Sequence, residues 1–235
     1  LTETGNEKFI PEYNKIKDAK SKPFFIWELE FIQVFKNNGG FDVIIGNPPY
    51  VKEYTNKKVF EPLKNNKYYQ GKMDLWYFFG TNGINLLSKN GIECFIAPNN
   101  WITNDGASKF RNKVLEETEI KIFVDFGNYK VFNSAAIQTM IYLLTKKKPK
   151  KVYEVNYSKL LTDVVTVETL NSFLYGMQPS SYYTKYNCKF EPALLKDKYI
   201  NFHKPEIKDI LDKMLVNAEF LNNNEAGQGI VAPQD

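Results

Sequence analysis

From residue 41 onwards, short continuous runs of apolar residues alternate with stretches in which apolar residues recur at helical spacing. The helical spacing predicts helices at 74–87 and 107–118, and Pro205 begins a third, amphipathic stretch at 205–216. Strands that alternate with helices indicate βαβ units, so we expect an α/β fold whose sheet is mainly parallel with an antiparallel edge. The continuous runs predict five strands, at residues 41–45, 92–97, 120–126, 136–144 and 152–157.

Other segments are less regular. Residues 24–35, FFIWELEFIQVF, carry aromatic rings whose bulk indicates docking against the sheet or the base of a site, and residues 55–72 lack periodicity and predict a mobile excursion. Asn90 and Gly91 are expected to end the helix that precedes the second strand. We expect residues 1–160 to form a partial α/β domain, and residues 161–235 a mainly irregular or helical extension with an Asn-rich linker.

The stretch GFDVIIGNPPYVKEY, residues 40–54, combines two opposite preferences. Its first part, Phe41 to Ile45, is β-branched and apolar, which predicts a fully buried strand. The two prolines that follow remove backbone donors, fix φ, and push Asn47 away from helical geometry. We therefore expect a rigid polar loop at the carboxyl end of a strand, where open α/β sheets place their sites.

This loop suits a planar molecule with an exocyclic amino group. The side-chain carbonyl of Asn47 and the backbone carbonyl of Pro48 could each accept one amine hydrogen and direct the nitrogen lone pair at an electrophile. The ring of Tyr50 would stack on the planar molecule, which for a nucleic-acid base contributes roughly 1 to 3 kcal/mol of binding free energy. The alternative interpretation is a turn that only ends the strand.

Charge changes this picture only locally, because the formal net charge of the 235 residues is +4. The lysines of 146–151 are expected to be a solvated surface. A second group lies among Tyr54, Tyr68 and Tyr69, and could equally face a polyanion or water. Its members are Lys52, Lys57, Lys58, Lys64, Lys67 and Lys72.

Cysteines and apolar runs exclude several classes of protein. Cys94 and Cys188 are far apart and form no CxxC pattern, so neither a disulfide framework nor a zinc site is predicted. No signal peptide and no apolar run of membrane length occur, so we expect a cytoplasmic protein without a membrane partner. The chain begins with Leu1 and ends within GQGIVAPQD, which indicates a fragment of a longer protein.

Several motifs together resemble the N6-adenine DNA methyltransferases, and in particular the large methylase subunits of type II restriction-modification systems. The similarity covers about residues 24–145 in the order of that family. The stretch GQGIVAPQD resembles the passage that leads into its target-recognition domain. The motifs are WELEFIQVFKNNGGFDVIIGNPPY, KMDLWYFF, LLSKNGIECFIAPNNWI and VFNSAAIQTMIYLL.

The resemblance implies S-adenosyl-L-methionine as cofactor, double-stranded DNA as partner, and a restriction endonuclease module or subunit as a further partner. Asn47 and Pro48 would hold the adenine amine, and Tyr50 would stack on a base flipped out of the duplex. Phe132 matches an aromatic residue on the other face of that base. The remaining matches concern the cofactor: Phe79 corresponds to an aromatic residue near its adenine, and Pro49 is a further contact.

The departures from the family are equally informative. No FxGxG loop precedes the motifs, and this loop holds the cofactor in the family. The resemblance therefore implies an α/β fold that is the C-terminal half of a Rossmann-like methyltransferase sheet. We expect the chain alone to be inactive.

Three alternatives remain. Protein glutamine N5-methyltransferases also use NPPY, RNA adenine methylation needs the same loop, and a non-catalytic DNA-binding fragment would need no cofactor loop. Glu206 and Lys208 have the ExK spacing of a metal-dependent nuclease, but a solvated charge pair on a helix is the better interpretation. His203 is the only histidine, which argues against a histidine-rich metal site and a Ser-His-Asp triad.

Overall fold

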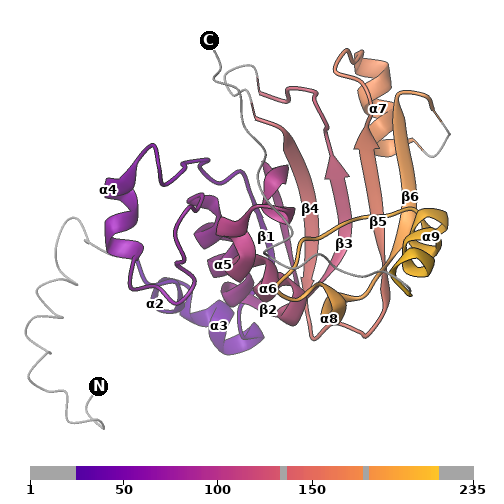
Figure 1. The fold of residues 1–235 in the computed structure, drawn as a ribbon. Coiled ribbons are helices and arrows are strands. Elements are labelled where there is room, and N and C mark those ends of the chain that lie inside the picture. Colours follow the sequence, from indigo (N-terminus) through magenta and orange to yellow (C-terminus); the bar gives the residue numbers. More distant parts are fainter. Residues whose placement is uncertain (1–24, 133–136, 177–179, 217–235) are drawn as a thin grey trace, which may run out of the picture.

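The computed structural model describes residues 25–132, 137–176 and 180–216. Their strands form one six-stranded sheet with helices packed around it (Figure 1). The strands lie in the order β1-β2-β4-β3-β5-β6. All five predicted strands are present, and a sixth follows them in the segment expected to be irregular or helical. The strands are β1 (Phe41–Gly46), β2 (Leu87–Pro98), β3 (Thr118–Asp125), β4 (Thr139–Lys146), β5 (Tyr153–Leu160) and β6 (Tyr183–Phe190).

Strand direction bears on two of the predictions. β1 and β2 are parallel, as are β3 and β5, but β4 runs antiparallel between β2 and β3 in the middle of the sheet. The expected mainly parallel sheet is confirmed, since β1, β2, β3 and β5 run in one direction, but the antiparallel β4 within the sheet was not foreseen. The expected antiparallel edge is confirmed by β6, which pairs antiparallel with β5. The division into domains at residue 160 stays a prediction.

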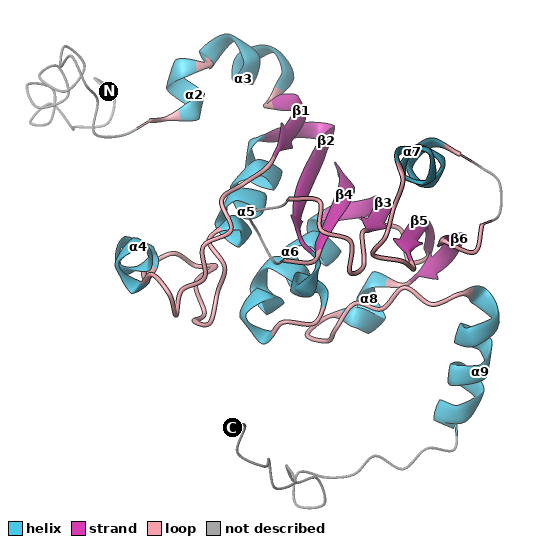
Figure 2. Cartoon of the chain, turned by 90° about the horizontal axis from the view of Figure 1, so that it is seen from above, coloured by secondary structure: helices cyan, strands magenta, loops and turns pink. Residues whose placement is uncertain are grey.

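Helices cover the two faces of the sheet unequally (Figure 2). The predicted helices at 74–87, 107–118 and 205–216 correspond to α5, α6 and α9, while the short helices and α7 were not predicted. α5 and α6 lie on one face, and α7 lies on the other face beside β5 and β6. The helices are α2 (Trp27–Glu30), α3 (Ile32–Asn38), α4 (Lys57–Phe60), α5 (Trp76–Leu86), α6 (Ser108–Glu117), α7 (Val167–Tyr175), α8 (Pro192–Leu195) and α9 (Pro205–Val216), with 3-10 turns at Glu61–Leu63, Asn99–Ile102 and Asp105–Ala107.

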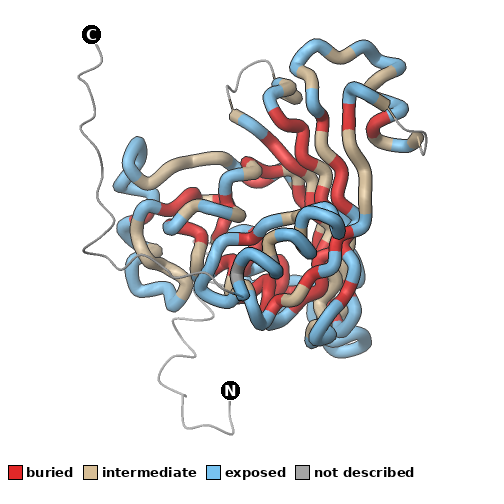
Figure 3. The backbone as a smooth tube through the Cα atoms, turned by 45° about the vertical axis from the view of Figure 1, so that its right-hand side comes forward, coloured by how far each residue is buried: buried red, intermediate tan, exposed pale blue. Residues whose placement is uncertain are grey.

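The main core lies between the sheet and the pair α5 and α6, where Figure 3 shows buried backbone. Many of its side chains are aromatic. The ring of Trp76 on α5 lies 5.2 Å from that of Phe110 on α6, and both side chains are buried in one cluster with Trp101 and Tyr142. Edge-to-face contacts of this kind stabilise beyond the burial of their area. A smaller cluster beneath α7 contains Phe126, Leu160, Phe173 and Tyr183.

β1 lies at the edge of the sheet, which corrects the expectation of a fully buried strand. Val43 is 62% exposed and Ile45 is 79% exposed, because no described helix covers that face of β1. Ile44 points the other way and packs against the main core. The aromatic lead-in docks on this edge as expected, since the rings of Phe31 and Phe35 lie 5.2 and 5.5 Å from that of Phe41.

β2 begins directly after α5 instead of at residue 92. Asn90 has φ +66°, and a side chain at Gly91 would come within 2.8 Å of the Phe41 carbonyl oxygen. Asn90 and Gly91 therefore lie within β2, where they allow an irregular pairing with β1. They do not end α5.

Residues 51–73, which we term the basic arm, connect the Asn-Pro-Pro-Tyr loop to α5. Its two ends lie side by side, since Glu53 N donates to Met73 O at 2.9 Å, and Leu75 N, two residues beyond the arm, donates to Val51 O at 2.8 Å. Phe60 at the end of α4 is fully buried in the main core. The segment 55–72, expected to be a mobile excursion, thus contains α4, a 3-10 turn and an anchor in the core.

Ion pairs on the rest of the surface correct two smaller expectations. Lys208 pairs with Glu191 at 3.5 Å, whereas the sequence predicted a solvated pair with Glu206. Lys147 pairs with the buried Glu119 at 2.7 Å, so the lysines of 146–151 are not simply solvated. No helix among the described residues combines the length and apolarity that crossing a membrane requires.

Candidate functional site

The Asn-Pro-Pro-Tyr loop leaves the carboxyl end of β1 and is fixed to the neighbouring strand by one hydroxyl group. The Tyr50 hydroxyl lies 2.7 Å from Asn47 Oδ1 and 3.0 Å from the Ile96 carbonyl oxygen on β2. The hydroxyl is the donor in both contacts, and its single hydrogen is shared between the two acceptor oxygens. Burial, and then the nearby Asp74 carboxylate, raise the pKa of Tyr50 to about 12, so the hydroxyl keeps its proton at neutral pH.

Asp74 supports this arrangement from the start of α5. It is buried, and its carboxylate faces the Trp76 amide at 3.5 Å. Burial raises the pKa of Asp74, while hydrogen bonds from backbone amides, including those of Trp76 and Val51, partly oppose that shift. Asp74 therefore ties the end of the loop to the first turn of α5.

Tyr50 also forms an aromatic pair with Phe132, a residue far along the chain. The two ring centroids are 6.4 Å apart and the rings are tilted by 57°. Phe132 follows β3 in a loop, and residues 133–136 after it lie outside the described part of the chain. The predicted partners on the two faces of a base are thus adjacent in the fold.

On the other side of Asn47 lies a cavity of about 520 Å³ between the loop, β1 and α5. Its polar groups come from the loop and from Asn82 on α5, and its most exposed aromatic residue is Phe79, which is 46% exposed. Apolar side chains make up most of the rest, as in typical small-molecule sites. The lining is Trp27, Phe41, Val43, Ile44, Ile45, Gly46, Asn47, Pro48, Pro49, Phe79, Asn82, Gly83, Leu86 and Phe95.

The structure therefore brings all six predicted site residues together in two groups that meet at Asn47. Pro48, Pro49 and Phe79 line the cavity with it, and its side chain bonds the hydroxyl of Tyr50, whose ring faces Phe132. Their chemical roles stay predictions.

Two participants were not foreseen from the sequence. Asn82 lies three residues after Phe79 on α5, so the helical repeat could have placed it beside that ring. The Ile96 carbonyl reaches Tyr50 only through the pairing of β2 with β1, which no local pattern announces. Among the described residues, no group of three or more His, Cys, Asp or Glu side chains could hold a metal ion.

The chain is similar to several known proteins. A chain from a structure of a type I restriction-modification system shares the fold, with a TM-score of 0.52 at 14% identity over 75% of this chain and 42% of that one. The type II restriction enzyme and methyltransferase RM.Eco57I of Escherichia coli is 29% identical over 53% of this chain. The type II methyltransferase M.BstVI of Geobacillus stearothermophilus is 24% identical over 66% of this chain.

These matches point to the class of restriction-modification methylases. The family model described as Eco57I restriction-modification methylase matches residues 2–132, and the chain belongs to that family. The resemblance seen in the sequence is confirmed at this level. The chain spans 13% and 28% of the lengths of the two relatives named above.

Proposed function

We propose that this chain is the catalytic-loop part of a DNA methyltransferase that methylates the N6 amine of adenine. The observation that carries the proposal is the position of Asn47 between the cavity and the pair Tyr50 and Phe132. A group held in the cavity and a base held by the rings would meet at this side chain. Membership of the Eco57I family supports the assignment to DNA.

Asn47 and Pro48 would accept the two hydrogens of the target amine. An amide oxygen has two lone pairs, so Asn47 Oδ1 can accept from the Tyr50 hydroxyl and from the amine at once. The Pro48 carbonyl accepts no hydrogen bond from any residue in the described part of the chain. Both acceptors sit on a loop that the prolines make rigid, so their orientation costs no reorganisation during the reaction.

A base between Tyr50 and Phe132 requires these rings to move. Two stacking contacts need about 7 Å between parallel rings, since contacting carbon atoms approach to about 3.5 Å. The observed separation is 6.4 Å with a tilt of 57°. We therefore infer that the extruded base widens the pair and turns the rings parallel.

The cavity fits the planar and apolar parts of S-adenosyl-L-methionine. Phe79 offers a ring face to the adenine, and Pro49 and Phe95 add apolar surface. The lining contains no Asp or Glu, so it offers no carboxylate to the ribose hydroxyls. When bound, this cofactor supplies an electrophilic methyl group to the amine that Asn47 and Pro48 orient. We infer that a cofactor loop absent from this chain completes the site, and that the chain alone is inactive.

Methyl transfer from labelled S-adenosylmethionine to duplex DNA tests the proposal, both in the chain and in a longer methylase that contains it. We expect Asn47→Ala to abolish formation of N6-methyladenine in the longer protein. The matched control is Asn187→Ala, at an exposed position on β6, which should retain the rate. An unchanged rate in Asn47→Ala would remove the loop from the mechanism.

Protein glutamine methylation is the second candidate, because a side-chain amide presents the same delocalised nitrogen. Hydrolysis of the labelled product distinguishes N6-methyladenine from methylated glutamine. Label that enters only protein, or RNA in preference to DNA, would overturn the DNA assignment. The name of RM.Eco57I, a restriction enzyme and methyltransferase, supports a restriction endonuclease module as a further partner.

A further inference from the structure

The basic arm, residues 51–73, carries six lysines and two glutamates, an excess of four that equals the formal net charge of the whole chain. The two glutamates are already engaged. Glu53 accepts hydrogen bonds from the Tyr69 hydroxyl and the Met73 amide, and Glu61 pairs with Lys64 at 2.8 Å. The other lysines make no ion pair with any described carboxylate. These are Lys52, Lys57, Lys58, Lys67 and Lys72.

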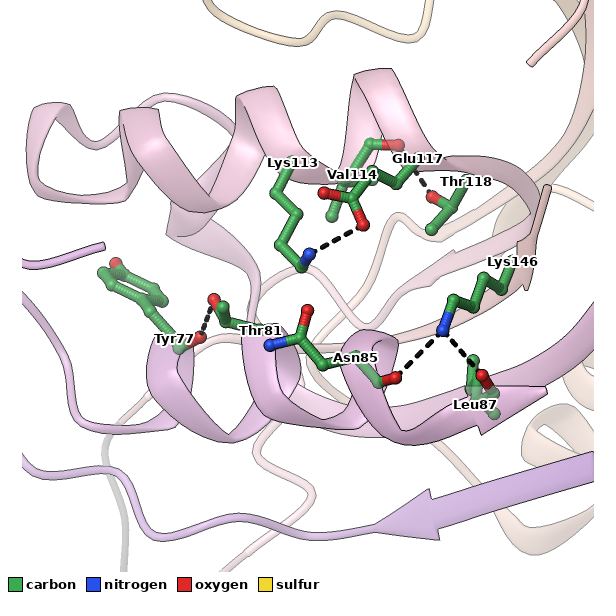
Figure 4. A network of polar contacts seen from close by, with 9 residues as sticks. All are labelled: Tyr77, Thr81, Asn85, Leu87, Lys113, Val114, Glu117, Thr118 and Lys146. Carbon is green, nitrogen blue, oxygen red and sulfur yellow. Dashed lines mark hydrogen bonds and ion pairs between the residues drawn. The ribbon is translucent and has the colours of Figure 1, made fainter. Parts of the chain in front are cut away.

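The lysines of 146–151 differ in this respect. Lys146 Nζ donates to the carbonyl oxygens of Asn85 at 2.9 Å and Leu87 at 2.6 Å, as Figure 4 shows. Lys147 is held by Glu119. The first two lysines of that stretch are bound by groups of the fold, whereas five of the six lysines of the basic arm make no ion pair with a described carboxylate.

The arm presents its lysines from a fixed scaffold. Phe60 is buried in the main core and its ring lies 6.4 Å from that of Phe78 on α5. Gln70 donates to the Asp105 carbonyl at 2.6 Å and to the Ser108 hydroxyl at 2.8 Å, which ties the arm to the start of α6. An ordered scaffold reduces the entropy that a partner must overcome on binding.

The arm borders the candidate site. Lys67 and Tyr68 line a cavity of about 470 Å³ whose opposite wall is α5, and that cavity shares Phe79 and Asn82 with the cavity beside the loop. Lys52 follows Tyr50 by two residues and lies over the ring of Tyr54, at 5.7 Å. Positive charge and exposed aromatic rings thus meet next to the place where the target base would enter.

We propose that the basic arm binds the phosphates of duplex DNA beside the flipped base. This inference rests on the proposed function for its choice of polyanion. A base that reaches Tyr50 brings its flanking phosphates close to the surface that follows Tyr50 in the chain. The lysines of the arm then release the counterions of those phosphates, so the affinity depends on salt and little on sequence.

The test measures binding of a fluorescent DNA duplex by the whole chain, as anisotropy at several salt concentrations, without cofactor. The arm variant is Lys57→Gln with Lys58→Gln, since both side chains are exposed on α4. The control is Lys150→Gln with Lys151→Gln, also exposed, which changes the net charge equally. Thermal unfolding of each variant checks that the fold is retained.

We expect the arm variant to bind on the order of tenfold more weakly at 100 mM salt. The slope of log affinity against log salt should fall by about two, because each substituted lysine no longer neutralises a phosphate and each accounts for about one. The control should bind within about twofold of the wild type. Equal losses in both variants, or no binding by the wild type, would overturn the proposal, as would tighter binding of RNA than of duplex DNA. Binding that follows this pattern while the longer methylase transfers no methyl group to DNA would refute the proposed reaction and leave the arm assignment standing.

Discussion

Glu93 on β2 is a carboxyl group buried in the core, and its protonation can be tested directly. The residue is fully buried, Tyr142 donates to Oε1 at 2.7 Å, and Oε2 has no hydrogen-bond partner. Burial raises the pKa of Glu93 to about 8 from its ordinary value of 4.5, against the opposing effects of Tyr142 and Lys113. Glu93→Gln keeps the shape and an acceptor for Tyr142 but cannot ionise.

The sign and size of the effect follow from the two pKa values. Between pH 4.5 and 8 the folded chain holds a proton on Glu93 that the unfolded chain has released, so unfolding releases a proton. The stability contribution of Glu93 is therefore complete below pH 4.5 and is lost as the pH rises towards 8. Each pKa unit corresponds to about 1.4 kcal/mol, so roughly 2 to 3 kcal/mol should be lost between pH 5.5 and 7.5.

Urea unfolding at pH 5.5, 6.5 and 7.5 measures this loss in the wild type and in Glu93→Gln. We expect the variant to lose less stability than the wild type over this range, by roughly 2 to 3 kcal/mol. The pH dependence is the readout, because the new amide leaves an unsatisfied group where Oε2 was and so changes the absolute stability as well. Glu154→Gln, at an exposed position on β5, is the control. Parallel pH profiles for wild type and Glu93→Gln would show that Glu93 is ionised in the fold.

Three further predictions concern the core and the loop. Gly83→Ala places a Cβ 1.9 Å from Glu93 Oε2, so we expect a loss of about 1 to 3 kcal/mol in thermal unfolding, which Glu93→Ala in the same chain should partly restore. Tyr50→Phe keeps the ring but removes the hydrogen bond to Asn47. The kcat of methyl transfer in the longer methylase should therefore fall about tenfold with little change in KM for DNA. A rise of similar size in KM for DNA would refute the positioning role. Phe60→Ala removes the anchor of the basic arm, and we expect it to lower stability by about 3 to 5 kcal/mol in urea unfolding, whereas an effect below about 1 kcal/mol would mean that the arm is held elsewhere.

The candidate site was largely predictable because its chemistry is local. Asn47, Pro48, Pro49 and Tyr50 are consecutive, so two prolines and an aromatic residue after a β-branched run were enough to indicate a rigid polar loop. Phe79 and Phe132 came only from the family resemblance, since an isolated aromatic residue has no local signature of function. Their meeting with the loop depends on where α5 and β3 lie.

The sequence by itself determined the five strands and three helices with strong periodicity, the α/β class and the loop residues, because these follow from side-chain spacing along a single segment. The tertiary structure decided the rest. It placed the antiparallel β4 inside the sheet, left one face of β1 exposed and added β6. Strand order and burial depend on which segments meet across the chain, and that balance of long-range contacts is not encoded in any local pattern.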